Sequence, residues 1–153
     1  MEYYHALDLS LSNCGYAIFG AIGNLLRVGS IHTDPKKSHG QRLEIIHDAL
    51  TLLRNKYPTK SLILESGFCR FNKATLALGE VKGVTILVYA DCEITEYAPK
   101  SIKKIVTGSG KSSKEEVAAK VGRRYPGIEF ENWDMSDAVS VGVAYFLKHN
   151  ILE

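Results

Sequence analysis

Four acidic residues from distant parts of the chain have the positions that a metal-dependent hydrolase needs. Asp8 and Glu65 each follow a short apolar run that is typical of a buried strand. Asp134 and Asp137 are three residues apart at an expected helix start, so both lie on one face of that helix. Ligands bind outside the carboxyl ends of strands in open α/β sheets. The four acids are therefore expected to form one cluster if the two strands are neighbours.

Such a cluster favours phosphodiester hydrolysis. Carboxylates packed together repel each other, so they need raised pKa values or bound cations, and hard oxygen donors favour Mg²⁺, Mn²⁺ or Ca²⁺. Two ions about 3.5 to 4 Å apart could activate a water molecule and stabilise the leaving 3′ oxygen. Plainer interpretations stay open, since an Asp after a strand is often a turn residue, and Asp134 with Asp137 could simply cap a helix.

Basic and aromatic residues suggest a nucleic-acid surface. The segment after Glu65 mixes the two types, which could stack on bases and neutralise phosphates, at Phe68, Arg70, Phe71 and Lys73. Between residues 97 and 124, eight basic residues stand against two acidic ones. The lysines expected to contact backbone phosphates there are Lys100, Lys104 and Lys111. A solvated helical face is the alternative interpretation of this basic run.

The elements that must position these residues follow from hydrophobic periodicity. Strands are expected over residues 3–7, 14–19, 25–31, 60–64 and 92–97, and the first three form an antiparallel meander because their connections are short. Helices are expected from about residue 40 to Pro58, and over residues 74–88, 99–107, 113–124 and 134–148. Ser112 with Glu115 has the spacing of a capping box. We write the order as βββαβαβαα with one further helix break, a mixed α/β layer architecture.

Length and composition favour one globular domain over residues 1–153. The chain has 153 residues, of which 45% are hydrophobic and 24% charged, and this length and composition suit one ordinary core. Its net charge is +2. No apolar run reaches the roughly 20 residues of a membrane span, and the N-terminus lacks a signal-peptide pattern. Three widely spaced cysteines fit a reducing compartment. A cytoplasmic protein is expected.

Several motifs together resemble the RuvC family of Holliday-junction resolvases, within the RNase H-like superfamily. They occur in the family's order along nearly the whole chain: ALDLS at residues 6–10, GYA at 15–17, LE at 64–65, ALGEVKGV at 77–84, YAPK at 97–100 and WDMSDA at 133–138. The chain departs from the family's usual Asp-Pro-Gly, since Leu9 and Ser10 follow Asp8. The compact form resembles phage-type members, and the resemblance implies a protein encoded by a bacterium or phage.

The resemblance implies a fold, an activity and a site. The fold is a five-stranded mixed sheet flanked by helices, and the activity is paired symmetric nicking of four-way DNA junctions by a homodimer with Mg²⁺ or Mn²⁺, two ions per active site. The metal-binding acids implied are Asp8, Glu65, Asp134 and Asp137. Lys103 and Lys114 match basic positions near the scissile phosphate, and Phe68 matches a stacking or wedge position.

Other functions remain to be weighed against this hypothesis. A broader branched-DNA or flap endonuclease would use the same fold and the same acids on another substrate shape. A noncatalytic junction-binding protein would gain nothing from four acids beside a phosphate. A sugar-kinase-like or actin-like ATPase also places an Asp after its first strand, but 153 residues leave no room for its second lobe.

Overall fold

A computed structural model describes residues 2–66 and 73–153 of the chain and contains one five-stranded mixed sheet. The strands lie in the order β3-β2-β1-β4-β5, with bounds β1 Tyr3–Asp8, β2 Asn13–Gly20, β3 Leu25–His32, β4 Thr59–Glu65 and β5 Glu93–Tyr97. The first three strands are antiparallel, whereas β4 and β5 run parallel to β1. The predicted mixed sheet, three antiparallel strands and then parallel strands, is confirmed.

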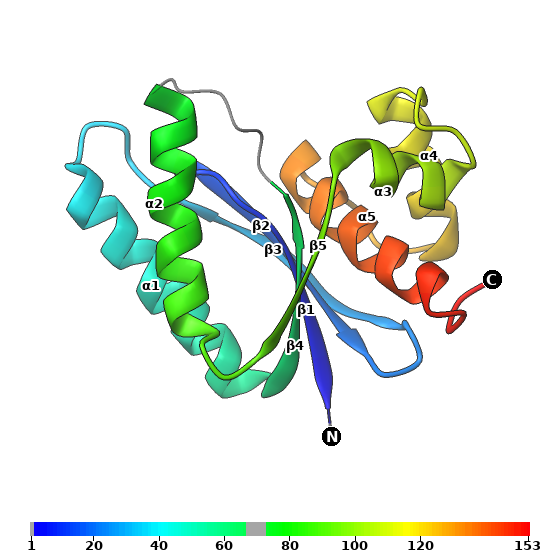
Figure 1. Cartoon of the computed structure of the whole chain (residues 1–153), viewed down its shortest axis with the longest axis horizontal. Helices are drawn as coiled ribbons and strands as arrows, with labels where there is room; N and C mark the ends of the chain where they lie inside the picture. Colours follow the sequence, from blue (N-terminus) through cyan, green and yellow to red (C-terminus); the bar gives the residue numbers. More distant parts are fainter. Residues whose placement is uncertain (1, 67–72) are drawn as a thin grey trace.

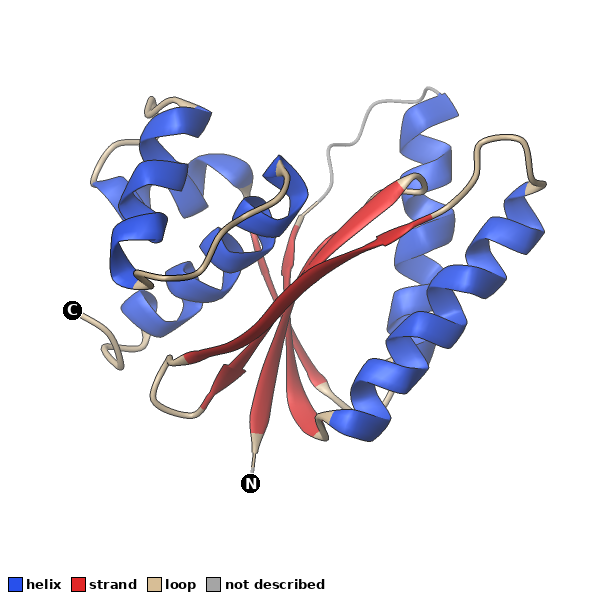
Figure 2. Ribbon diagram, turned by 180° about the vertical axis from the view of Figure 1, so that it is seen from behind, coloured by secondary structure: helices blue, strands red, loops and turns tan. Residues whose placement is uncertain are grey.

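Helices cover both faces of the sheet (Figure 1). On one side lie α1 (His39–Lys56) and α2 (Lys73–Val88), and on the other lie α3 (Pro99–Thr107), α4 (Lys114–Arg124) and α5 (Trp133–Lys148). The view from behind shows the same two groups with the twisted sheet between them (Figure 2). Two helical layers thus enclose the sheet.

Three helices follow the last strand, so the further helix break that the predicted order allowed is present. Gly108 adopts the left-handed conformation, with φ 91°, and its N–H bonds to the carbonyl of Lys104, which ends α3. Gly127, with φ 89°, turns the chain after α4. These two turns separate the three helices that the sequence predicted over residues 99–107, 113–124 and 134–148.

The predicted N-cap of the helix that became α4 was wrong by one residue. The side chain of Ser113 accepts from the backbone N–H of Glu116 at the start of α4, so Ser113 is the N-cap. Ser112 is buried instead, and its hydroxyl pairs with that of Thr107. A neighbouring serine therefore takes the cap, because Ser112 is turned into the protein.

The core has two layers because alternate residues of a strand face opposite sides. On β1, Ala6 packs in the layer under α5, and Leu7 packs in the layer under α1 and α2. On β4, Ile63 lies on the α5 side and Leu62 on the other. Both central strands are buried on both faces, as their continuous apolar runs predict.

Among the helices of residues 2–66 and 73–153, none combines the length and the hydrophobicity that a membrane-spanning helix needs.

Candidate active site

Two of the acids lie side by side at one edge of the sheet. Because β1 and β4 are adjacent and parallel, with Leu7 paired to Leu64, the strands end together, on Asp8 and on Glu65. Both acids line one hollow beside the first helical residues of α3. The expectation that the two strand ends converge is confirmed.

The first turn of α5 brings the other two acids to the same place. Asn132 caps the helix by accepting from the N–H of Met135, and Asp134 and Asp137 follow on one face. On β2, Gly15 pairs with Asp8, and a Cβ at Gly15 would collide with the backbone carbonyl of Asp134. The absence of a side chain at Gly15 thus lets the start of α5 approach the end of β1.

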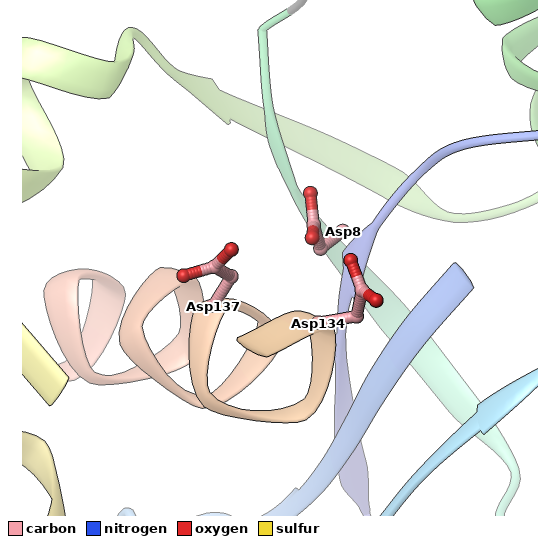
Figure 3. A group of neighbouring side chains, drawn as sticks. All are labelled: Asp8, Asp134 and Asp137. Atoms are coloured by element: carbon pink, nitrogen blue, oxygen red, sulfur yellow. The ribbon is translucent and has the colours of Figure 1, made fainter. Parts of the chain in front are cut away.

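Asp8, Asp134 and Asp137 form a group able to hold a metal ion. One carboxylate oxygen from each lies within 4.8 Å of the others, and all three residues are half-buried. Figure 3 shows the three carboxylates facing a common space, one from β1 and two from α5. Glu65 is not a member of this three-residue group, although its charge acts on Asp8. All the donors are carboxylate oxygens, which fit a hard divalent cation.

The electrostatics show that the acids repel one another. Burial, together with the charges of the three neighbouring acids, raises the pKa of Asp8 to about 8. Burial and the charge of Asp137 raise the pKa of Glu65, and burial raises that of Asp137. Such a cluster is stabilised by nearby positive charge.

Two of the predicted lysines border the acids. Lys114, the first residue of α4, places its Nζ 3.2 Å from Oδ2 of Asp137. This contact opposes the rise in the pKa of Asp137. Lys103 of α3 lines a hollow together with Glu65, Lys114 and Asp137, and its charge opposes the rise in the pKa of Glu65. The structure therefore brings Lys103 and Lys114 to the acidic group, as expected.

The other predicted DNA contacts fall into two groups. Phe68, Arg70 and Phe71 lie outside the described residues. The remaining predicted positions are exposed, and within the described ranges none lines a hollow with the acids: Lys73, Lys100, Lys104 and Lys111. Their part in DNA binding stays a prediction.

Sequence reasoning missed two residues beside the site. The side-chain amide of Asn13, at the start of β2, donates to Oδ2 of Asp134, and Asn13 is itself held by bonds to Ser10. Lys82 of α2 lines the hollow with Asp8 and pairs with Glu96 at 2.6 Å. A polar residue at a strand start and a lysine within the ALGEVKGV motif were the available signals, and both were too common to stand out.

Comparison with known proteins finds similarity to one family along almost the whole chain. The family model described as crossover junction endodeoxyribonuclease RuvC matches residues 6–145. Relatives of that name from Zymomonas mobilis and Granulibacter bethesdensis are 32% and 34% identical, over 94% and 91% of this chain and 89% and 82% of theirs.

Solved structures show the same fold. Thermus thermophilus RuvC in complex with a Holliday junction substrate has a TM-score of 0.85 at 21% identity, covering 99% of this chain and 96% of that chain. The yeast mitochondrial Holliday junction resolvase Ydc2 has a TM-score of 0.59 at 14% identity, covering 97% and 82%. With the fold, the acidic group and the family match in agreement, the chain belongs to the RuvC family of crossover junction endodeoxyribonucleases.

Proposed function

We propose that this protein resolves four-way DNA junctions by using Asp8, Glu65, Asp134 and Asp137 to hold two Mg²⁺ or Mn²⁺ ions. The observation that carries the proposal is the convergence of Asp8 of β1 with Asp134 and Asp137 of α5 on one space. Glu65, at the end of β4, lines one hollow with Asp8. Membership of a family of endodeoxyribonucleases supports the same activity. When bound, such ions supply an activated water and stabilise the leaving oxygen of the phosphodiester.

The residues around the acids then have distinct tasks. Asp8, Asp134 and Asp137 offer ligand oxygens that lie close together, and Glu65 adds a fourth carboxylate from the adjacent strand. Asn13 holds Asp134 in place through its amide. Lys114 and Lys103 offer ammonium groups where the charge of the reacting phosphate grows, and preorganised charge of this kind lowers the barrier.

The proposed substrate is branched DNA, bound mainly through its phosphates. One solved relative of the same fold was captured with a Holliday junction substrate. Exposed lysines on α3 and in the following turn are available to backbone phosphates, at Lys100, Lys104 and Lys111. Affinity is then expected to fall steeply as salt rises.

We also propose a homodimer that uses the outer face of α2. This helix exposes a stripe of apolar and small residues, in which Leu76 and Leu87 are 63% and 68% exposed, and Gly79 and Gly83 have nothing within 4 Å of an added Cβ. Large apolar side chains left open on one face favour a partner. A two-fold pair would present two sites to two strands of one junction.

Residues 1–153 are proposed to act as one nuclease domain, and the cytoplasmic location expected from the sequence stays a prediction. Neither point changes the chemistry proposed for the acids.

Cleavage of a labelled synthetic four-way junction tests the function. With Mg²⁺ the protein should make paired symmetric nicks and leave a linear duplex of the same sequence intact. Glu65→Gln should bind the junction but lose cleavage by at least about 10²-fold. Glu129→Gln, a change at an exposed acid away from the cluster, should cut normally.

The other outcomes separate the alternatives. Equal cleavage of flaps and junctions would show a broader branched-DNA nuclease. Junction binding without any cut in Mg²⁺ or Mn²⁺ would refute catalysis and leave a binding role.

A further inference from the structure

A single exposed tryptophan stands at the rim of the acidic group. Trp133 is the only tryptophan in the chain, is 47% exposed, and directly precedes Asp134 at the start of α5. The Nζ of Lys114 lies 5.2 Å from the centre of its ring and 3.2 Å from Oδ2 of Asp137. One lysine therefore contacts both the ring of Trp133 and one of the carboxylates proposed to hold the metal ions.

A hollow of about 510 Å³ opens beside this ring. Its walls combine aromatic and small residues with polar ones, namely Ala118, Phe130, Glu131, Asn132, Trp133 and Ser136. Trp133 and Ser136 are three residues apart on α5, so they occupy neighbouring positions on the helix surface. The hollow thus lies next to the turn that carries Asp134 and Asp137.

One of the residues that line the hollow has a buried polar atom without a hydrogen-bond partner in the described part of the chain. Ser136 is only 3% exposed, and its Oγ makes no hydrogen bond within residues 2–66 and 73–153. Ser140, one turn later, satisfies its own hydroxyl by donating to the carbonyl of Ser136. A buried hydroxyl without a partner is costly, so Ser136 is suited to a ligand that brings a donor or an acceptor.

We infer that Trp133 and Ser136 bind one unpaired nucleobase of the DNA, next to the phosphate that is cut. This inference rests on the proposed function. A flat aromatic ligand with polar edges matches the hollow, because its face can stack on Trp133 while its edge bonds to the hydroxyl of Ser136. Bases at a branch point are unstacked most readily, which suits a junction substrate.

Intrinsic fluorescence reports on this site directly, since Trp133 is the only tryptophan. The cut position is first mapped with the unaltered protein. Junctions are then prepared with an abasic site on either side of that phosphate, and binding is measured with Glu65→Gln protein, which leaves the DNA intact. We expect the intact junction to quench the fluorescence of Trp133, and one abasic junction to leave it unquenched.

Cleavage supplies the second readout. Trp133→Ala should lower kcat/KM on the intact junction by about 5- to 150-fold, the range for stacking one base on an aromatic ring. The abasic junction that lacks the bound base should lower the kcat/KM of the unaltered protein by a similar factor. The same junction should not lower the kcat/KM of Trp133→Ala any further. Trp133→Phe should recover most of the loss, and Ser136→Ala should weaken the preference among the four bases at that position.

Matched controls and distinct failures complete the test. Leu26→Ala removes a similarly exposed side chain, 45% exposed on β3, and should change neither readout. Two results would overturn the nucleobase site alone. In one, the protein cuts the junction but binding does not quench the fluorescence of Trp133. In the other, Trp133→Ala and the abasic site each lower kcat/KM independently of the other. A protein that cuts no junction would overturn the proposed function and this inference together.

Discussion

Among single residues, Asp8 shows how burying several acids together lowers the stability of the metal-free protein. Its pKa of about 8 lies far above the usual 3.8, so the folded chain binds this proton more tightly than the unfolded chain. The resulting penalty appears as pH rises from about 4 and is complete above about 8. Asp8→Asn should therefore stabilise the metal-free protein by about 1 to 3 kcal/mol at pH 8.

Denaturant unfolding in EDTA, measured from pH 5 to pH 9, checks this difference. Adding Mg²⁺ at 100 times its Kd should stabilise the unaltered protein by about 2.7 kcal/mol and Asp8→Asn far less. Asp48→Asn, at an exposed acid on α1, is the matched control and should alter neither result. An Asp8→Asn protein that is less stable in EDTA at pH 8 would contradict the proposed repulsion.

At the scale of elements, the contact between β2 and α5 determines whether the acids meet. A side chain at Gly15 would strike the backbone carbonyl of Asp134 and push the start of α5 away from β1. We expect Gly15→Ala to destabilise the fold by about 1 to 3 kcal/mol and to lower kcat by about 10- to 100-fold. Thermal unfolding and junction cleavage measure the two effects.

Gly122→Ala is the control for this substitution. Gly122 lies in α4, where an added Cβ would meet nothing within 4 Å, so alanine should stabilise the helix by about 0.5 to 1 kcal/mol and leave cleavage unchanged. Normal activity in Gly15→Ala would show that the helix start can shift without harm.

A second contact between elements makes the fold sensitive to acid. His5 of β1 is fully buried, and its two ring nitrogens bond to the hydroxyl of Tyr89 and the carbonyl of Tyr57, at 2.7 Å each. Burial lowers the pKa of His5 to about 4, so the unfolded chain takes up this proton first. The stability that His5 contributes is complete above about pH 7 and is lost as pH falls from 6.5 toward 4.

The comparison with His5→Gln isolates this effect, since glutamine does not titrate. The free energy of unfolding of the unaltered protein, relative to His5→Gln, should fall by about 2 kcal/mol between pH 7 and pH 5. Urea titrations at several pH values measure it. Curves that stay parallel would rule out His5 as the source.

For the whole molecule, the exposed face of α2 predicts an assembly. Leu87→Glu puts a charge on the apolar face of the proposed contact, so the protein should become monomeric in sedimentation and make unpaired nicks. Leu52→Glu, on α1 with 69% exposure, is the matched control and should remain dimeric. A monomeric unaltered protein would refute the dimer.

Much of the fold follows from patterns confined to a few residues. Alternation and apolar runs identified the strands, and the spacing of Asp134 and Asp137 placed both acids on one helical face. The start of α4 could not be predicted to the residue, because two adjacent serines could each cap the helix. The hydroxyl of Ser112 pairs with that of Thr107, so Ser113 accepts the bond from the helix N–H. That choice depends on packing and not on local sequence.

The sequence by itself determined the types of the candidate site residues and their places at strand and helix ends, from which metal-assisted hydrolysis is proposed. Only the tertiary structure decided which residues support them. The bond from Asn13 to Asp134 joins residues 121 positions apart, and the hollow beside Trp133 gathers residues of α4, α5 and the turn between them. Local propensity acts over one or two turns of chain, whereas such contacts depend on how whole elements pack against the sheet.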